Sequence, residues 1–141
     1  YKEDYEFKIG KSITLNKGKD ITIFSSGAMV YQCLEAAKLI EKKGLSCKIV
    51  NMHTIKPIDS LSIDLACQES NLIVSVEEHN VIGGLGSAIA EHKATIKNSP
   101  KMLILGIKDT YGKSGSYNFL KEKHRLTPLL IVEDILKNYL K

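Results

Sequence analysis

The sequence predicts an α/β protein with a three-layer α/β/α fold, whose five-stranded mixed sheet has one antiparallel edge strand. Two observations lead to this fold class. Short apolar runs alternate along the chain with segments whose apolar residues recur at helical spacing. The links between them are short and rich in glycine, asparagine, serine and proline. Alternating apolar strands and amphipathic helices are typical of a largely parallel sheet covered by helices on both faces.

The apolar runs place the strands at residues 12–15, 21–24, 47–52, 72–76 and 102–107, the last of these as a buried strand. The link 16–20 is too short for a parallel crossover, so the first two strands are expected to be antiparallel if they lie side by side. The other strands follow one another through helices and are therefore expected to be parallel.

Helical periodicity appears between these strands. The predicted apolar stripes are Val30, Cys33, Leu34, Ala37 and Ile40; then Leu61, Leu65 and Ala66; then Leu85, Ala88, Ile89, His92 and Ile96; and finally Leu130, Ile131, Ile135, Leu136 and Tyr139. A shorter helix is expected over residues 117–125. Ser25, Ser26, Asp59 and Thr127 are the N-cap candidates, and Pro128 suits the first helical position.

Composition excludes several classes of function. Hydrophobic residues make up 43% and charged residues 26% of the 141 residues, and the net charge is only +4. The lysines are scattered without interleaved aromatic residues, which argues against a nucleic-acid partner. No apolar run approaches the roughly 20 residues of a membrane span, so no membrane partner is expected. The three cysteines lack C-x-x-C spacing and are expected to be reduced thiols of a cytoplasmic protein.

The most distinctive stretch begins where the strand 72–76 ends. Glu77, Glu78, His79 and Asn80 follow that apolar run directly. They could form a general acid/base group or part of a metal site, but adjacent residues of an extended chain point to opposite faces. The other histidines are isolated in the sequence, so no metal site is predicted. The structural interpretation is that the carboxylates accept hydrogen bonds from loop amides or form ion pairs at an interface.

A glycine-rich turn, Gly83-Gly84-Leu85-Gly86, comes next and leads into a helix. As a dinucleotide fingerprint it fails, because Ile89 stands where the third glycine or an alanine is needed. A helix that opens on glycines can bind an anion through its free amides. The favoured interpretation is a tight turn that lets two backbones approach closely. With a second polar loop at 108–116, this leaves two polar loops on one rim and no complete catalytic set.

Several longer segments together resemble one protein family. They are residues 7–11, 18–23, 26–27 and 51–59, the stretch 77–88, and the loop Lys108-Asp109-Thr110-Tyr111-Gly112-Lys113-Ser114-Gly115. Over essentially the whole chain they resemble the C-terminal domain of the transketolase family of thiamine-diphosphate enzymes, most closely the separately encoded C-terminal subunit type of transketolase. The same domain closes 1-deoxyxylulose-5-phosphate synthase and the beta subunits of 2-oxoacid dehydrogenases, which remain alternatives.

This resemblance implies a transferase of carbohydrate metabolism that moves a two-carbon ketol unit between sugar phosphates. It implies thiamine diphosphate and Mg²⁺ for the full enzyme, held by an N-terminal pyrophosphate domain and a pyrimidine-binding domain. No catalytic, cofactor-binding or metal-binding residue carries over to this chain. The domain by itself is therefore expected to be inactive, to stabilise a homodimer and to lie against the pyrimidine-binding domain.

The resemblance also divides the chain into a linker arm, 1–10, and a C-terminal-type domain, 11–141. The candidate contact residues all lie on the rim formed by the two polar loops. They are Glu77, Glu78, His79, Asn80, Gly83, Gly84, Gly86, Asp109, Thr110, Tyr111, Gly112, Ser114 and Gly115. The alternative from a different functional class is a free-standing sensor that binds anions or nucleotides at the glycine loop.

Overall fold

The computed structural model describes residues 5–140, so the first four residues of the predicted linker arm lie outside the described part of the chain. The five strands are β1 (Ile13–Asn16), β2 (Ile21–Ser25), β3 (Cys47–Asn51), β4 (Leu72–Asn80) and β5 (Lys101–Ile107). The five helices in this part of the chain are α1 (Met29–Glu41), α2 (Ser60–Glu69), α3 (Leu85–Lys93), α4 (Tyr117–Lys123) and α5 (Pro128–Tyr139). None of the helices described is long and apolar enough to cross a membrane.

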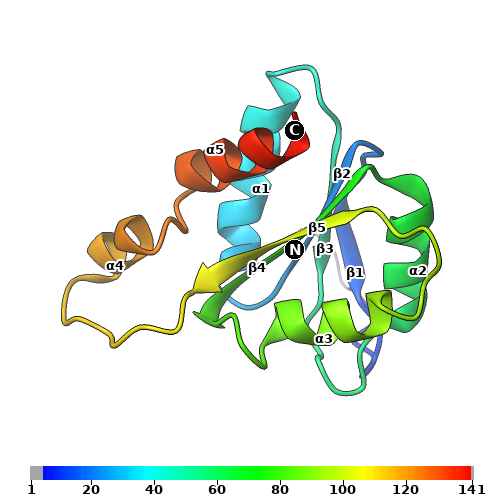
Figure 1. Cartoon of the computed structure of the whole chain (residues 1–141), viewed down its shortest axis with the longest axis horizontal. Coiled ribbons are helices and arrows are strands. Elements are labelled where there is room, and N and C mark those ends of the chain that lie inside the picture. The colour runs from blue at the N-terminus through cyan, green and yellow to red at the C-terminus, as the bar shows by residue number, and fades with distance from the viewer. Residues whose placement is uncertain (1–4, 141) are drawn as a thin grey trace.

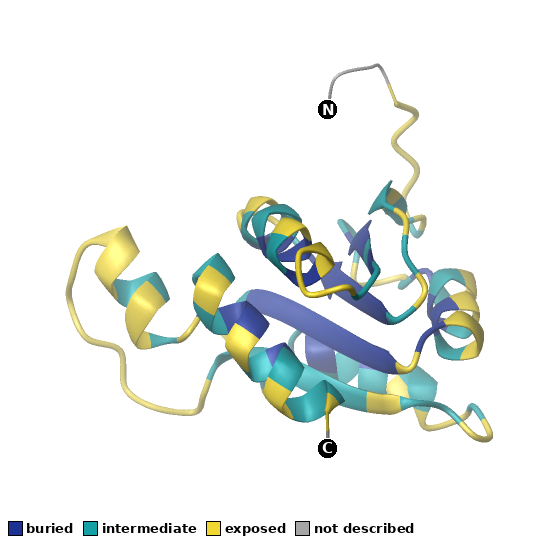
Figure 2. Cartoon of the chain, turned by 90° about the horizontal axis from the view of Figure 1, so that it is seen from above, coloured by how far each residue is buried: buried dark blue, intermediate teal, exposed yellow. Residues whose placement is uncertain are grey.

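The predicted fold class is confirmed. The strands form one sheet in the order β1-β3-β2-β4-β5, with β1 antiparallel and the others parallel. Helices α1 and α5 cover one face of the sheet, while α2 and α3 cover the other (Figure 1). Each face has its own apolar cluster, one around Ile23, Cys33 and Ile135 and one around Phe24, Ile63 and Ile89. Figure 2 shows that the buried residues concentrate on the central strands between these helix layers.

Strand pairing differs from the simplest expectation in one respect. The edge strand β1 hydrogen-bonds to β3 and not to β2, although only a short turn separates β1 from β2. The turn passes Gly18 directly over the β3 backbone, where a Cβ atom would collide with the main chain of Cys47 and Lys48. The chain therefore crosses the end of β3 before it enters β2.

Two local predictions about helices were wrong, whereas the predicted N-cap positions of Thr127 and Asp59 were correct. Helix α1 begins after Ala28, with no side-chain cap, because Ser25 belongs to β2. In α2 the residue on the core side is Ile63, while Leu61 and Leu65 are 61% and 49% exposed. Thr127 occupies the N-cap position of α5 without a side-chain hydrogen bond, whereas the Asp59 side chain does cap α2, accepting from the amide of Ser62.

The strands β4 and β5 also depart from prediction. The strand β4 continues to Asn80, so the polar residues 77–80 are strand residues and not a loop. The strand β5 was expected to be buried, but its residues are only half-buried or exposed. The reason is its place in the sheet, because β5 pairs with β4 on one side only.

Candidate functional site

Glu77 is the central residue of the carboxyl rim, which we define as the ends of β4 and β5 with residues 81–87 and 108–116. Its side chain is buried, with 2% of its surface exposed. Its two carboxylate oxygens accept hydrogen bonds from the amides of Leu85 and Gly86, at 2.8 and 2.9 Å. These amides open helix α3, whose N-cap residue Gly84 has no side chain to cap it. Glu77 therefore supplies the anion that the N-terminus of α3 favours.

The glycines of the turn allow this close contact. A Cβ atom on Gly84 would collide with the carboxylate of Glu77, and one on Gly86 would lie 2.5 Å from a methyl carbon of Ile104. Gly83 has φ +76°, a conformation that side chains disfavour. The interpretation of the glycines as a close-approach turn is thus correct. An external anion at α3 would have to displace Glu77 from the two amides.

Glu78 points the other way, as strand alternation requires, and connects β4 to α4. Its carboxylate accepts a hydrogen bond from the hydroxyl of Tyr117 at 2.7 Å. This bond to a carboxylate raises the pKa of the Tyr117 phenol above its ordinary value. The ammonium of Lys121 lies 4.7 Å from the centre of the Tyr117 ring. Glu78 thereby holds the first turn of α4 against the rim.

Asn80 connects the two rim loops, whereas His79 is an exposed residue of β4. The Asn80 side chain donates to Asp109 at 3.4 Å and accepts from the amide of Ile82 at 2.9 Å. Thr110 donates back to the carbonyl of Lys108. The structure thus brings the glycine turn and the start of the second loop together, as the sequence predicted.

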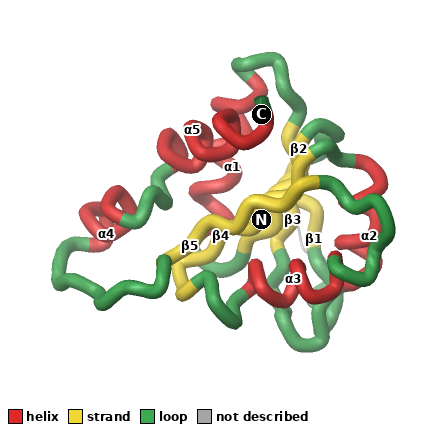
Figure 3. Tube along the Cα trace, in the orientation of Figure 1, coloured by secondary structure: helices red, strands yellow, loops and turns green. Residues whose placement is uncertain are grey.

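The rest of the second loop extends into solvent. Tyr111 is fully exposed, and Gly112, Ser114 and Gly115 are exposed as well. Helix α4 follows and contains no buried residue, with Tyr117 51% and Phe119 50% exposed. It lies apart from the rest of the helices at the end of a long loop (Figure 3). A helix of seven residues is too short to be stable alone in water, so α4 depends on contacts such as the bond from Tyr117 to Glu78.

The sequence analysis missed a second set of contacts, between the arm and the connection from β3 to α2. The ring of Phe7 lies 4.5 Å from that of His53, and the amide of Gly10 donates to the Thr54 hydroxyl. Asp59 accepts from both the amide and the hydroxyl of Ser12 at 2.8 and 3.0 Å. The predicted cap at Asp59 was the only signal for this anchor in the sequence.

His92, which is isolated in the sequence, has an acidic partner in the fold. The Nε2 atom of His92 on α3 lies 2.8 Å from Asp64 on α2, which joins the two helices of that face. Within residues 5–140, no group of three or more histidine, cysteine or acidic side chains could hold a metal ion. The amides that open α3 are already taken by Glu77. The residues of the rim therefore do not fit the diphosphate and Mg²⁺ of a thiamine cofactor.

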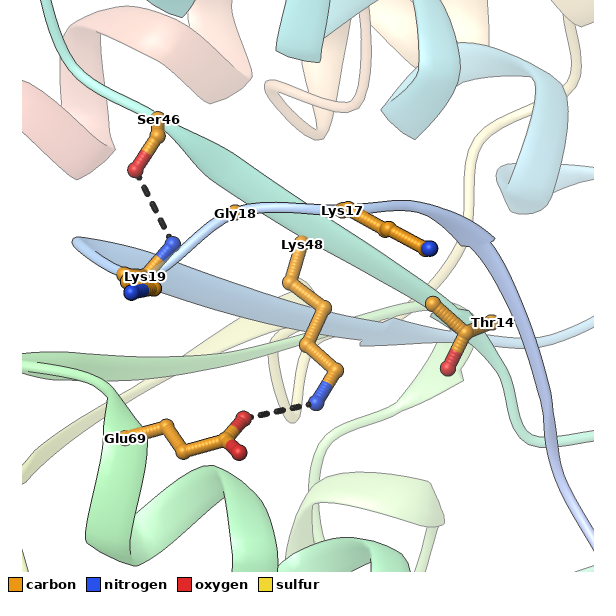
Figure 4. A pocket seen from close by; sticks show the side chains of 7 residues that line it. All are labelled: Thr14, Lys17, Gly18, Lys19, Ser46, Lys48 and Glu69. Atoms are coloured by element: carbon orange, nitrogen blue, oxygen red, sulfur yellow. Dashed lines mark hydrogen bonds and ion pairs between the residues drawn. The ribbon is translucent and has the colours of Figure 1, made fainter.

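Two hollows on the surface are large enough for a small ligand. One, of about 450 Å³, lies beside the glycine turn between Ile55, Ile58 and Ala88. Another, of about 910 Å³, lies at the opposite end of the sheet. Figure 4 shows that its side chains do not converge, because Lys17 and Lys19 point apart and Lys48 is paired with Glu69 at 3.0 Å. This second hollow is not a site that is built for an anion.

The sequence of the chain is similar to that of known proteins. Residues 10–131 match the family described as Transketolase, C-terminal domain. The chain is 38% identical over 131 residues to the 6-deoxy-6-sulfo-D-fructose transketolase subunit SqwH of Clostridium sp., covering 92% of this chain and 40% of that protein. It is 32% identical over 131 residues to the 1-deoxy-D-xylulose-5-phosphate synthase of Dictyoglomus turgidum, covering 93% of this chain and 21% of the synthase.

A solved structure gives the same result. A split-gene transketolase, described as an inactive beta4 tetramer, superposes with a TM-score of 0.91 at 36% identity. The match covers 97% of this chain and 45% of that one. The chain thus spans less than half the length of the relatives that it matches. These agreements in sequence and fold show that the chain belongs to the transketolase family, whose members depend on thiamine diphosphate, and that it corresponds to their C-terminal domain.

Proposed function

We propose that this chain is the non-catalytic assembly domain of a transketolase that transfers a two-carbon ketol unit between sugar phosphates. Its partners are the pyrophosphate- and pyrimidine-binding domains of the same enzyme, which bind thiamine diphosphate and Mg²⁺, and a second copy in a homodimer. The enzyme is cytoplasmic. The observation that carries the proposal is the chemistry of the carboxyl rim, where the one deeply buried carboxylate, Glu77, is used to hold the fold.

The exposed part of the rim supports a docking role. Ile82 is 70% exposed at the glycine turn, and Tyr111, Tyr117 and Phe119 are at least half exposed on the second loop and α4. Large apolar side chains that are gathered on one edge of a domain mark an interaction surface. The candidate residues from Glu78 to Gly84 and from Asp109 to Gly115 lie at or beside this surface, whereas the candidate Gly86 is buried under it. We assign them to contacts with the pyrimidine-binding domain.

Helix α4 offers the sharpest test of docking. Replacing Phe119 by serine removes an exposed aromatic side chain, and the isolated domain should retain its stability to within about 0.5 kcal/mol. In the complete enzyme the same change should weaken assembly, measured by sedimentation, and lower ketol transfer from a ketose phosphate. Tyr31→Ser on α1 is the matched control, since Tyr31 is an exposed aromatic residue on another element. Equal loss in both variants, or in neither, would contradict a docking role for α4.

The substrate is tested separately. A transketolase transfers the ketol unit to an aldose phosphate, whereas 1-deoxyxylulose-5-phosphate synthase joins pyruvate to glyceraldehyde phosphate and a 2-oxoacid dehydrogenase acts on a 2-oxoacid. The identity to the synthase of Dictyoglomus turgidum makes the synthase the second candidate. Incubating the complete enzyme with each donor and identifying the product by mass spectrometry distinguishes the three. Release of CO₂ from pyruvate would overturn the transketolase assignment.

A further inference from the structure

The outer edge of β5 is an open strand edge with unusual composition. The strand pairs with β4 on one side, and no other described strand, within residues 5–140, pairs with its other side. Figure 1 shows β5 in front of the sheet with α3 and α5 on either side of it and α4 beyond its end. From Met102 to Ile107 the strand carries no charged residue. Natural proteins normally protect such an edge with charge, proline or a cover.

The backbone groups that face outward can be identified. The amide of Val81, which follows β4, donates to the carbonyl of Ile107. Because successive residues of a strand point their hydrogen-bonding groups to opposite sides, the odd-numbered residues of β5 face β4. The even-numbered residues, Met102, Ile104 and Gly106, direct their amides and carbonyls away from the sheet. Pro100, which has no amide proton, stands at the N-terminal end of this row of outward-facing backbone groups.

This row of groups is complementary to itself. If two copies pair antiparallel about a twofold axis at Leu105, the Ile104 groups bond to Gly106 of the other copy and the Met102 groups bond to Lys108. In the same register Lys101 of each copy lies beside the segment that follows β5 of the other copy, where the exposed Asp109 stands two residues beyond the end of the strand. Cross-strand pairs of opposite charge favour one register over its neighbours. A register shifted to an axis at Ile104 moves these two charges apart.

We propose that the β5 edge is the contact with a second copy of this chain, forming a continuous antiparallel pairing of two sheets across a twofold axis at Leu105. The proposal rests on the assembly role given above and names the surface that performs it. Only an isologous contact uses the same strand on both partners. It also covers the half-exposed side chains of Leu103 and Leu105, which lie at the margin of the core that includes α1 and α5.

Cysteine cross-linking in the complete protein tests the register. At the twofold axis of such a pairing, the two copies of residue 105 form a non-hydrogen-bonded pair with Cα atoms about 4.5 Å apart, within reach of a disulfide. Leu105→Cys should therefore give a covalent dimer under mild oxidation. Leu103→Cys, on the same face of the same strand, is the matched control. Its two copies would lie about 13 Å apart and should stay monomeric in a denaturing gel.

A second variant tests the hydrogen bonds without a new thiol. Met102→Pro removes an outward amide that the single domain does not use, together with a side chain packed at the margin of the Phe24 cluster. Proline is tolerated at sheet edges, so the fold should persist with some loss of stability, checked by circular dichroism. The dissociation constant of the assembly, measured by sedimentation, should rise at least tenfold. Cross-linking of Leu103→Cys equal to that of Leu105→Cys, or an unchanged dissociation constant with Met102→Pro, would overturn the proposal. If activity still required this domain after such a result, the assembly role would stand and only the β5 contact would be wrong.

Discussion

Replacing Glu77 by glutamine tests the idea that the buried carboxylate holds the N-terminus of α3. The amide oxygen can still accept from either Leu85 or Gly86, but the NH₂ group then faces the other backbone amide. That amide loses its partner in a buried place, which costs about 1–3 kcal/mol. Loss of the negative charge at the helix N-terminus costs up to about 2 kcal/mol in a partly buried setting. We expect the free energy of unfolding to fall by about 3 kcal/mol.

The measurements are urea unfolding and thermal unfolding, both followed by circular dichroism. For a domain of this size, a loss of 3 kcal/mol should lower the melting temperature by roughly 10 °C. Glu78→Gln is the matched control, because Glu78 is the next residue on the same strand and bonds only to an exposed tyrosine. Its unfolding free energy should change by less than about 1 kcal/mol. If the two variants lose stability equally, the carboxylate of Glu77 does not have the role inferred from its contacts.

Three further outcomes follow from particular contacts. Gly18→Ala should cost about 1–3 kcal/mol in urea unfolding, since its Cβ would meet the β3 backbone, whereas Gly112→Ala should be neutral because nothing lies within 4 Å. Tyr117→Phe removes the hydrogen bond to Glu78 and should speed amide hydrogen exchange in α4 about fivefold. In the unsubstituted protein the same bond should hold below pH 10 and be lost as the pH rises through the raised pKa of the Tyr117 phenol. Burial raises the pKa of Cys33 to about 12, so a thiol reagent at pH 8 should label Cys67 first and Cys33 only after unfolding; equal rates would contradict this packing.

The sequence predicted which segments form the carboxyl rim, but it did not predict most of the side-chain contacts made there. Alternation along a strand was enough to separate Glu77 from Glu78 and to argue against a shared metal ion. The pairing of Glu77 with the amides of α3 was one stated possibility, and the geometry selects it. The link from Glu78 to Tyr117 spans 39 residues, and no local pattern encodes it.

The sequence by itself determined the fold class, the element order and the antiparallel edge strand, because hydrophobic periodicity and link length are local properties of the chain. The family likewise followed from motifs that can be read in the printed sequence. Only the tertiary structure decided that β1 pairs with β3 and that β5 forms the second edge of the sheet, where its residues are half-exposed. Such facts depend on contacts between distant residues, so Leu61 and Leu65 look like core residues in sequence and face solvent in the fold.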